Sequence, residues 1–305
     1  MKNKVTIATR ASSLALVQAE IVKDLLVTRW PGLQVELLKL TTEGDRILDR
    51  PLRNEGGKGL FVKEIEEALL DGRADLAVHS MKDVPGELPE GLCIPVILKR
   101  EEARDAFVSE KYENLAQLPP QAKVGTTSLR RKLQVLKLRP DLQILDLRGN
   151  VDTRLKKLQA GDYDAILLAC AGLNRLGLAS HIKEKLPFIP APGQGAIGIE
   201  CRLKDEEVLQ LIQDFNDEES YACVQAERVV LKRLEGGCEL PLGAHAQFES
   251  GKLRLKAFVA EPNGNKYLED EVVGDPILAL DLGEKLSQIL LDQGALDILK
   301  SVRKS

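Results

Sequence analysis

The fold is decided by the stretch VTIATRASS, residues 5–13. Val5 to Ala8 predicts a short strand, and the polar turn after it contains residue types that favour a helix N-cap. Apolar residues then recur at helical spacing at Leu14, Val17, Ile21 and Leu25. Pro31-Gly32 ends this helix, and residues 35–40 predict a second strand. A strand, a helix and a strand in this order indicate a parallel sheet with a right-handed crossover.

The alternation of helices and strands continues along the chain. A helix over residues 60–70, with Phe61 on its apolar face, and a buried strand over residues 75–78 complete the first block. A second block begins near Arg104, and its predicted elements are a strand ending at Val124, a helix over 129–138, a strand over 142–147, a helix over 150–159 and a strand over 164–170. A Pro/Gly linker over 189–195 follows, and residues 196–201 predict a strand that returns to the first sheet.

The last block, from about residue 220, has a different pattern. Its predicted elements are a helix over 221–234, strands over 252–260 and 266–273 around a Pro-Asn-Gly-Asn turn, and a helix over 277–291. We therefore expect an α/β protein of three domains, in which the third is a small α+β domain. The expected boundaries are residues 1–99 with 195–216, residues 103–190 and residues 219–305.

The composition excludes several classes of protein. The 305 residues are 44% hydrophobic and 30% charged, which is typical of a soluble globular chain. A net charge of -4 gives no general attraction to nucleic acid or acidic membranes, so anion binding must come from local clusters. No apolar run approaches the roughly 20 residues of a membrane span, and the N-terminus has no signal-peptide core. Five scattered cysteines without a CxxC pair indicate reduced thiols, no metal site and a cytoplasmic protein.

Hydroxyl, basic and acidic side chains follow several predicted strands, at the ends where open α/β sheets bind ligands. They are Arg10 after the first strand, Ser80, Lys82 and Asp83 after the 75–78 strand, Ser128, Arg130 and Arg131 at the start of the 129–138 helix, and Arg148 and Arg154 around the 150–159 helix. One arginine on a helix surface is ordinarily solvated, but several at strand ends in two domains indicate a cleft for a polyanion. The planar guanidinium fork suits carboxylate or phosphate.

Two further features allow more than one interpretation. Asp83 either neutralises the cations around it, or stabilises a substrate cation or moves a proton. The glycine-rich segment 41–59 contains GGKG at 56–59, which lacks the spacing of a phosphate-binding loop. We interpret this segment as a hinged, cationic lid.

The sequence LEGGCELP, residues 234–241, places Cys238 after two glycines and before a proline. Glycine permits a tight turn, so the thiol can be presented at its tip as a nucleophile or an attachment point. A buried cysteine behind a helix C-cap explains the same pattern. On local sequence alone the second interpretation is favoured.

Together these motifs resemble the porphobilinogen deaminase (hydroxymethylbilane synthase) family, and the resemblance covers nearly the whole chain. The matching segments are IATR (7–10), GGKGLF (56–61), AVHSMKDVP (77–85), GTTSLRR (125–131), LRGN (147–150), AGL (171–173), GQGA (193–196) and EGGC (235–238). Single motifs are weak, but the ordered set, above all HSMKDVP with EGGC, is highly specific.

The resemblance implies a transferase of tetrapyrrole biosynthesis, which joins four porphobilinogen molecules into hydroxymethylbilane and releases ammonia. It implies a dipyrromethane cofactor, attached through a thioether to Cys238, and a monomer that needs no metal. It also implies two lobes that resemble periplasmic binding proteins, with the active site between them and the cofactor on the third domain. The chain departs from the family at Asn54, where a basic residue is common, and the adjacent Arg53 is the candidate replacement.

The resemblance also implies roles for individual residues. Asp83 corresponds to the catalytic carboxylate, which stabilises the cationic azafulvene formed as each porphobilinogen loses ammonia. Besides Cys238, the implied cofactor-binding residues are Lys82, Arg130, Arg131, Ser80 and Ser128. The implied substrate-binding residues are Arg10, Arg148, Arg154, Arg175, Lys58, Gln194 and Phe61.

Two other functions fit parts of the sequence. A non-catalytic anion-binding module of the periplasmic type would explain two lobes and an arginine-lined cleft, but it leaves the cysteine domain unexplained. A cysteine-nucleophile acyltransferase would need a histidine base near Cys238, for which His245 and His79 are the candidates. The first predicts no covalent adduct, and the second predicts a free, alkylatable Cys238.

Overall fold

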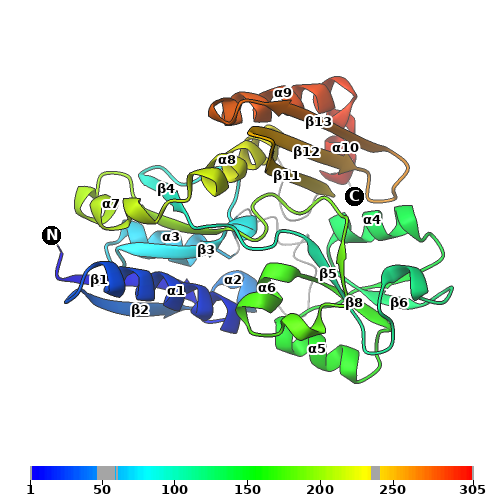
Figure 1. Cartoon of the computed structure of the whole chain (residues 1–305), viewed down its shortest axis with the longest axis horizontal. Coiled ribbons are helices and arrows are strands. Elements are labelled where there is room, and N and C mark those ends of the chain that lie inside the picture. The colour runs from blue at the N-terminus through cyan, green and yellow to red at the C-terminus, as the bar shows by residue number, and fades with distance from the viewer. Residues whose placement is uncertain (1, 47–58, 60, 235–240, 304–305) are drawn as a thin grey trace.

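The computed structural model describes residues 2–46, 59, 61–234 and 241–303. Within these ranges the chain forms two α/β lobes and a third, smaller domain of helices and sheet (Figure 1). Each lobe contains a five-stranded sheet, and the third domain contains a three-stranded sheet. The predicted fold class is thereby confirmed. None of the described helices has the length and hydropathy that a membrane span requires.

The first sheet has the strand order β2-β1-β3-β10-β4. Its strands are β1 (Lys4–Arg10), β2 (Gln34–Leu40), β3 (Leu76–Ser80), β4 (Leu92–Ile97) and β10 (Ile197–Arg202). β1 pairs in parallel with both β2 and β3, as the β-α-β order predicts. β10 pairs antiparallel with β3 and β4, so the chain returns to this sheet after it has formed the second lobe.

The described helices of the first lobe are α1 (Ser13–Arg29), α2 (Glu43–Arg46), α3 (Lys63–Leu70) and α7 (Glu206–Ile212). The predicted helix over 60–70 thus begins later than expected, and Phe61 precedes α3. Helix α1 has the predicted extent, but its buried residues are Ala15, Gln18, Ala19, Val22 and Leu26. Ile21 and Leu25 of the predicted apolar stripe are each 36% exposed. The small alanines let α1 lie close to the sheet, so the sheet covers their face of the helix.

The second sheet has the order β7-β6-β8-β5-β9. Its strands are β5 (Asp105–Val108), β6 (Lys123–Gly125), β7 (Gln143–Leu145), β8 (Ala165–Ala169) and β9 (Glu184–Leu186). Its helices are α4 (Leu129–Leu138), α5 (Val151–Gln159) and α6 (Cys170–Arg175). Helices α4 and α5 begin at side-chain caps, where Ser128 accepts from the Arg131 N–H and Asn150 accepts from the Thr153 N–H.

Two segments join the lobes: residues 98–104 lead from β4 to β5, and residues 187–196 lead from β9 to β10. They lie in contact, because the Glu101 N–H donates to the Gly195 carbonyl at 3.2 Å. Gly195 has a φ of +89°, and a Cβ there would lie 2.5 Å from the Glu101 carbonyl oxygen. Only glycine adopts this φ readily and has no Cβ to clash. Gly195 therefore permits the close approach of the two segments between the lobes, which we call the first crossing (98–104) and the second crossing (187–196).

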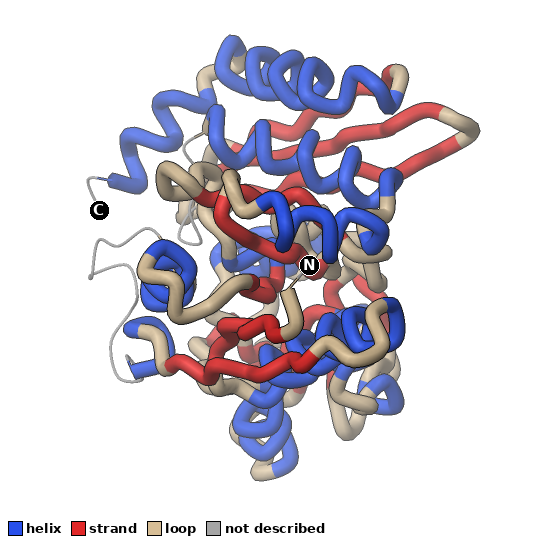
Figure 2. The backbone as a smooth tube through the Cα atoms, turned by 90° about the vertical axis from the view of Figure 1, so that its left-hand side faces the viewer, coloured by secondary structure: helices blue, strands red, loops and turns tan. Residues whose placement is uncertain are grey.

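The third domain is an antiparallel sheet with the order β11-β12-β13. Its elements are β11 (Leu242–Glu249), β12 (Lys252–Ala260), β13 (Tyr267–Gly274), α8 (Glu218–Arg233), α9 (Ala279–Asp292) and α10 (Ala295–Arg303). Its core includes Val230, Leu255 and Leu286. The domain lies on one side of the two lobes in both views (Figure 1, Figure 2).

Candidate functional site

A short turn after β3 brings three predicted site residues to the carboxyl end of the first sheet. β3 ends at Ser80, and Met81–Asp83 form one turn of 3-10 helix. Met81 is buried, and its N–H donates to the Ala196 carbonyl at 3.0 Å. A Cβ on Gly193 would lie 2.7 Å from the Met81 Cβ, so glycine lets the second crossing lie against the turn. Lys82 and Asp83 remain partly exposed beside it.

Arg10 meets Asp83 because β1 and β3 are parallel neighbours and end at the same edge of the sheet. The Arg10 Nη1 lies 3.7 Å from the Asp83 Oδ2. The same guanidinium lies over the Phe61 ring, 4.3 Å from its centroid. Gly44 contacts the Phe61 ring at a position where any Cβ would clash with it. Phe61 therefore supports Arg10 from a segment that precedes α3.

Ser80 has a partner that the sequence did not indicate. The Gln18 Nε2 donates to the Ser80 Oγ at 2.8 Å, and Gln18 is 2% exposed. A buried amide must find hydrogen-bond partners, which explains why Gln18 occupies the face of α1 that lies on the sheet. The only sequence signal for this hydrogen bond is a polar residue between two alanines on the face of α1 that lies on the sheet.

The site continues into the second lobe through Lys82. Burial lowers the pKa of the Lys82 ammonium, Asp83 opposes this, and the guanidinium charges of Arg131 and Arg154 lower the pKa further. Burial likewise lowers the pKa of the Arg154 guanidinium to about 10, with Arg131 adding to the effect and Asp83 opposing it. These interactions require that the Ser80–Asp83 turn and the starts of α4 and α5 face one another. Charged groups of both lobes therefore lie close to one another around Asp83.

Arg130 and Arg131 are buried and share one carboxylate, Asp105. Arg130 binds it with two hydrogen bonds of 2.6 and 3.1 Å, and the Arg131 Nε donates to it at 2.8 Å. Burial would raise the pKa of the Asp105 carboxyl, but the two guanidinium charges hold it well below its ordinary range. The predicted residue Gln194, 1% exposed, donates to Asp105 at 3.0 Å. Asp105 was missed, although an acid at the start of the apolar run Ala106-Phe107-Val108 is an available signal.

The remaining basic residues of the prediction lie around this centre. The Arg154 Nε donates to the Gly149 carbonyl at 2.7 Å, which holds the side chain at the start of α5. Arg148 is partly buried in the segment between β7 and α5. The Arg175 Nη2 donates to the Gly195 carbonyl at 2.6 Å, and burial lowers the pKa of its guanidinium while Glu101 opposes the shift. Arg175 therefore ties α6 to the second crossing.

Glu227 fastens the third domain to the crossings. Its carboxylate, fully buried on α8, accepts from Arg100 at 2.6 and 3.1 Å, from the Gly193 N–H at 2.6 Å and from the Ala246 N–H at 2.7 Å. Burial would raise the pKa of Glu227, but Arg100 and then His245 lower it to about 2. A charged residue on the buried face of α8 is the sequence signal for this junction.

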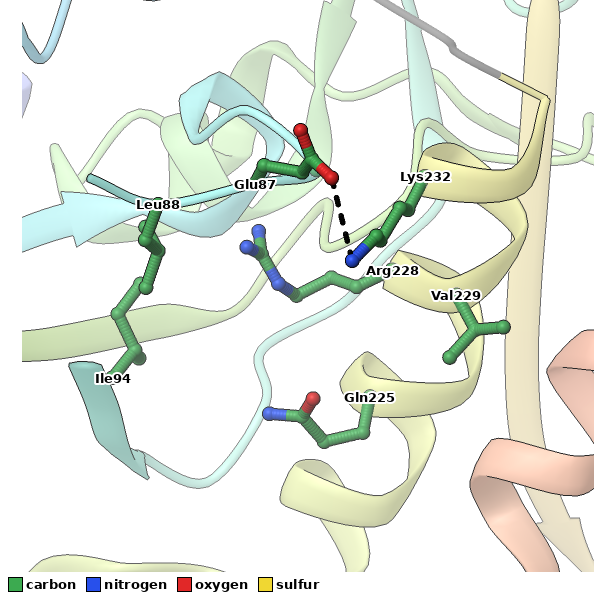
Figure 3. A pocket seen from close by; sticks show the side chains of 8 residues that line it. Glu87, Leu88, Ile94, Gln225, Arg228, Val229 and Lys232 are labelled. Atoms are coloured by element: carbon green, nitrogen blue, oxygen red, sulfur yellow. Dashed lines mark ion pairs between the residues drawn. The ribbon is translucent and has the colours of Figure 1, made fainter. Parts of the chain in front are cut away.

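A pocket lies between residues 86–88, Ile94 and one face of α8 (Figure 3). Arg228 donates to the Pro85 carbonyl at 2.9 Å, just after Asp83. Lys232 lies 3.3 Å from Glu87 across the pocket (Figure 3). Helix α8 thus supports the chain that leaves the turn.

Two predicted site residues, Lys58 and Cys238, lie outside the described residues. The residues that flank the Cys238 segment, Leu234 and Pro241, are buried. In the part of the chain that is described, no group of three or more His, Cys, Asp or Glu side chains is arranged to hold a metal ion. The chemistry that the described side chains offer is a carboxylate, Asp83, among cations that can bind several carboxylates.

Distant structural similarities were found among solved substrate-binding proteins. A putative methionine-binding lipoprotein from Bacillus subtilis is 14% identical over 70% of this chain and 90% of its own, with a TM-score of 0.44. The methionine-binding protein MetQ is 17% identical over 72% of this chain and 92% of its own, with a TM-score of 0.45. The periplasmic aliphatic sulphonate binding protein SsuA from Escherichia coli is 15% identical over 77% of this chain and 71% of its own, with a TM-score of 0.40. This likeness is too distant to carry an argument.

Two family models match the chain directly. Residues 5–210 match the model of the porphobilinogen deaminase dipyromethane cofactor binding domain. Residues 221–292 match the model of the porphobilinogen deaminase C-terminal domain. The first match alone spans more than half of the chain and covers the sheets of both lobes. The second match covers the three-stranded sheet of the third domain. The chain therefore belongs to the porphobilinogen deaminase family.

Proposed function

We propose that the cleft between the two lobes, centred on Asp83, is the active site for the reaction of the porphobilinogen deaminase family. That reaction joins four porphobilinogen molecules head to tail into hydroxymethylbilane, with release of ammonia, in tetrapyrrole biosynthesis. The enzyme is a transferase with a dipyrromethane cofactor. This proposal rests on the surroundings of the Asp83 carboxylate. Its Oδ2 lies 3.7 Å from the Arg10 Nη1, and it interacts electrostatically with Arg154 of the other lobe.

The donor set of the cleft fits the cofactor. Each pyrrole of a dipyrromethane built from porphobilinogen carries an acetate and a propionate, so the group needs several cations. When bound, it supplies the pyrrole carbon to which the first substrate unit is joined. Lys82 is partly exposed in the cleft and suits these carboxylates, and the partly exposed Arg10 and Arg154 suit the carboxylates of the substrate.

We assign the attachment to Cys238, through a thioether. The Glu227 carboxylate supports this, because it binds the Gly193 N–H, and Gly193 packs against Met81 of the Ser80–Asp83 turn. Helix α8, which leads to Cys238, is thereby tied to the turn that carries Asp83.

Asp83 has the central role in this proposal. Porphobilinogen develops positive charge as ammonia leaves, and a fixed carboxylate beside the pyrrole nitrogen stabilises that charge. The Arg10 Nη1 lies 3.7 Å from the Asp83 Oδ2 and orients this carboxylate. The Arg10 guanidinium also lies over the Phe61 ring, which holds it in place. The pair thus pre-organises the carboxylate before substrate binds.

Arg130 and Arg131 act differently in this proposal. The terminal nitrogens of Arg130 donate to Asp105 twice, to the Ile189 carbonyl and to Gln194. We therefore propose that Arg130 acts through Asp105, as a support for the cleft. Arg131 donates from Nη1 to the Leu167 carbonyl at 3.1 Å, and its Nη2 lies 2.7 Å from the Asp105 Oδ1, so each terminal nitrogen keeps a second N–H for a cofactor carboxylate.

The other assignments follow the same chemistry. Substrate carboxylates are bound by Arg148, Arg175 and Lys58, while Ser80, Ser128 and Gln194 orient the basic residues or the cofactor. Gln194 does so through Asp105, to which it donates at 3.0 Å.

Replacing Asp83 by Asn tests the placement. Asp83→Asn keeps the shape of the side chain and removes the charge, so it should fold, retain cofactor mass and lose turnover by about 10²- to 10³-fold or more. The exposed Asp71→Asn serves as the matched control. A turnover near that of the wild type would remove Asp83 from the mechanism.

The intact mass of the purified enzyme, followed by peptide mapping, tests the attachment. We expect an increment of two deaminated porphobilinogen units on the peptide that contains Cys238, and none in Cys238→Ser. The same increment in Cys238→Ser would place the anchor elsewhere, with Cys223 and Cys201 as the next candidates.

The remaining expectations are proposals as well. We propose the domain boundaries 1–99 with 195–216, 103–190 and 219–305, and a cytoplasmic monomer that binds neither nucleic acid nor metal. Limited proteolysis tests the boundaries, sedimentation tests the monomer, elemental analysis tests the metal, and fractionation of the source cells tests the location.

A further inference from the structure

Cys93 and Cys201 face one another on neighbouring strands of the first sheet. They are opposed in the antiparallel pairing of β4 with β10, directly after a register shift between Ile199 and Cys201. Directly opposed residues in such a pair have Cα atoms about 4.5 to 5.5 Å apart, which lies within the range that a disulfide spans. Their Sγ atoms are 3.9 Å apart. Side-chain rotation alone can therefore bring the two sulfurs to bonding distance.

The two thiols differ in access and acidity. Cys93 is partly exposed, whereas Cys201 is fully buried. The hydrogen bond between the two thiols lowers the pKa of Cys93, although burial opposes the shift, and it raises the pKa of Cys201. Burial raises the pKa of Cys170 to about 11 and that of Cys223 to about 12. Because the thiolate is the reactive form, Cys93 is the most reactive of these four cysteines.

The position of the pair in the chain gives a bond between them an unusual span. β4 leads out of the first lobe and β10 leads back into it. Every strand of the second sheet, β5 to β9, lies between Cys93 and Cys201 in the sequence. A disulfide would therefore close a covalent ring that contains the whole second sheet.

The pair is also remote from the Ser80–Asp83 turn. Along β10, Ile197 lies opposite Ser80, whereas Cys201 lies opposite Leu76 at the other end of β3. A bond at Cys201 therefore leaves the turn that carries Asp83 undisturbed.

We propose that Cys93 and Cys201 form a reversible dithiol–disulfide pair, oxidised by a low-molecular-weight disulfide such as oxidised glutathione. The Cys93 thiolate attacks one sulfur of the oxidant, the S–S bond of the oxidant breaks, and one glutathione thiolate leaves. Cys201 then loses its proton to solvent and attacks the Cys93 sulfur, which releases the second glutathione thiolate. The protein loses two hydrogen atoms, and the oxidant is reduced to two thiols.

The disulfide restricts the unfolded chain and not the active site. A crosslink that closes a long loop lowers the conformational entropy of the unfolded state, so the oxidised enzyme should unfold at a higher urea concentration. Turnover should stay unchanged, because the bond lies at the far end of the sheet.

The experiment uses the cofactor-loaded enzyme, incubated in mixtures of reduced and oxidised glutathione and then trapped with an alkylating reagent. We expect the trapped protein to carry two fewer alkyl groups as the mixture becomes more oxidising, and to carry them again when dithiothreitol is added before trapping. Tryptic mapping should give one crosslinked peptide pair containing Cys93 and Cys201. Cys93→Ser and Cys201→Ser should abolish the change, whereas Cys223→Ser, the matched control, should retain it.

Three results would overturn the proposal. They are thiols that stay fully reduced in pure oxidised glutathione, a stable glutathione adduct on Cys93 that never closes, and a crosslink between other cysteines. Mapping of the wild-type enzyme distinguishes these outcomes even if a serine variant fails to fold.

Discussion

Glu66 is predicted to make the stability of this enzyme depend on pH, and Glu66→Gln should remove that dependence. Glu66 lies on the buried face of α3 and is 8% exposed. Burial, and then the nearby charge of Glu200, raise the pKa of its carboxyl from 4.5 to about 7, while His79 opposes the shift. Glu200 is itself buried and lies 2.8 Å from the His79 Nε2. Gln has the shape of the protonated glutamic acid, so it shows the protein without the titration.

The direction of the pH dependence follows from whether the folded or the unfolded protein holds the proton on Glu66. Between pH 4.5 and pH 7 the unfolded chain ionises Glu66 while the folded protein keeps it protonated, so the free energy of unfolding falls as pH rises. Above pH 7 both states are ionised and the loss is complete. A difference of about 2.5 pH units at 1.36 kcal/mol per unit gives roughly 3 kcal/mol in total, of which about 2.5 kcal/mol is lost between pH 5 and pH 8.

Urea unfolding of the wild type and of Glu66→Gln at several pH values between 5 and 8 measures the effect. The difference in unfolding free energy should grow with pH in favour of the variant, by about 2.5 kcal/mol. Glu67→Gln is the control, because its side chain is exposed on the same helix and loses the same charge. A difference that stays constant across this range would refute the reasoning.

Other predictions concern the buried network and the cleft. Asp105→Asn should lose about 3 kcal/mol or more of unfolding free energy, because it leaves two buried guanidinium groups underpaired; urea unfolding measures it, and a loss below about 1 kcal/mol would contradict it. Glu227→Gln should cost about 2 kcal/mol and increase hydrogen exchange at the Gly193 and Ala246 N–H groups. Unchanged hydrogen exchange at these two N–H groups would show that Glu227 does not join α8 to Gly193 and Ala246. Because burial lowers the pKa of Lys82, which we assign to the cofactor carboxylates, turnover should begin to fall at a lower pH in the wild type than in Lys82→Arg; coincident alkaline limbs of the two pH profiles would count against this.

The sequence predicted the elements well where local pattern decides them. The 129–138 helix matches α4 at both ends, and the β1-α1-β2 unit has the predicted parallel pairing. Strands β4, β5, β9 and β11 were missed. Strands as short as β9 contain too few residues to show alternation, so only the pairing with a neighbour reveals them.

The candidate site was predicted in part for a related reason. Residues that follow strands are recognisable, because the carboxyl ends of parallel strands meet at one edge. Arg10 and Asp83 were expected at the same site on this ground, and they lie 3.7 Å apart. The supporting residues Asp105, Glu227 and Gln18 were not recognised, because each is a single polar residue on an apolar face whose partner lies in a distant segment.

By itself the sequence determined the β-α-β order, the family through its ordered motifs, and the positions of the basic residues at strand ends. These features depend on neighbours within about one turn or one strand, so they can be read along the chain. Only the tertiary structure decided that Arg130 and Arg131 share the buried Asp105, that Glu227 joins α8 to the crossings, and that Cys93 faces Cys201. The physical reason is that buried charges and thiols take partners set by sheet order and by the two crossings between lobes, which bring together residues far apart in sequence.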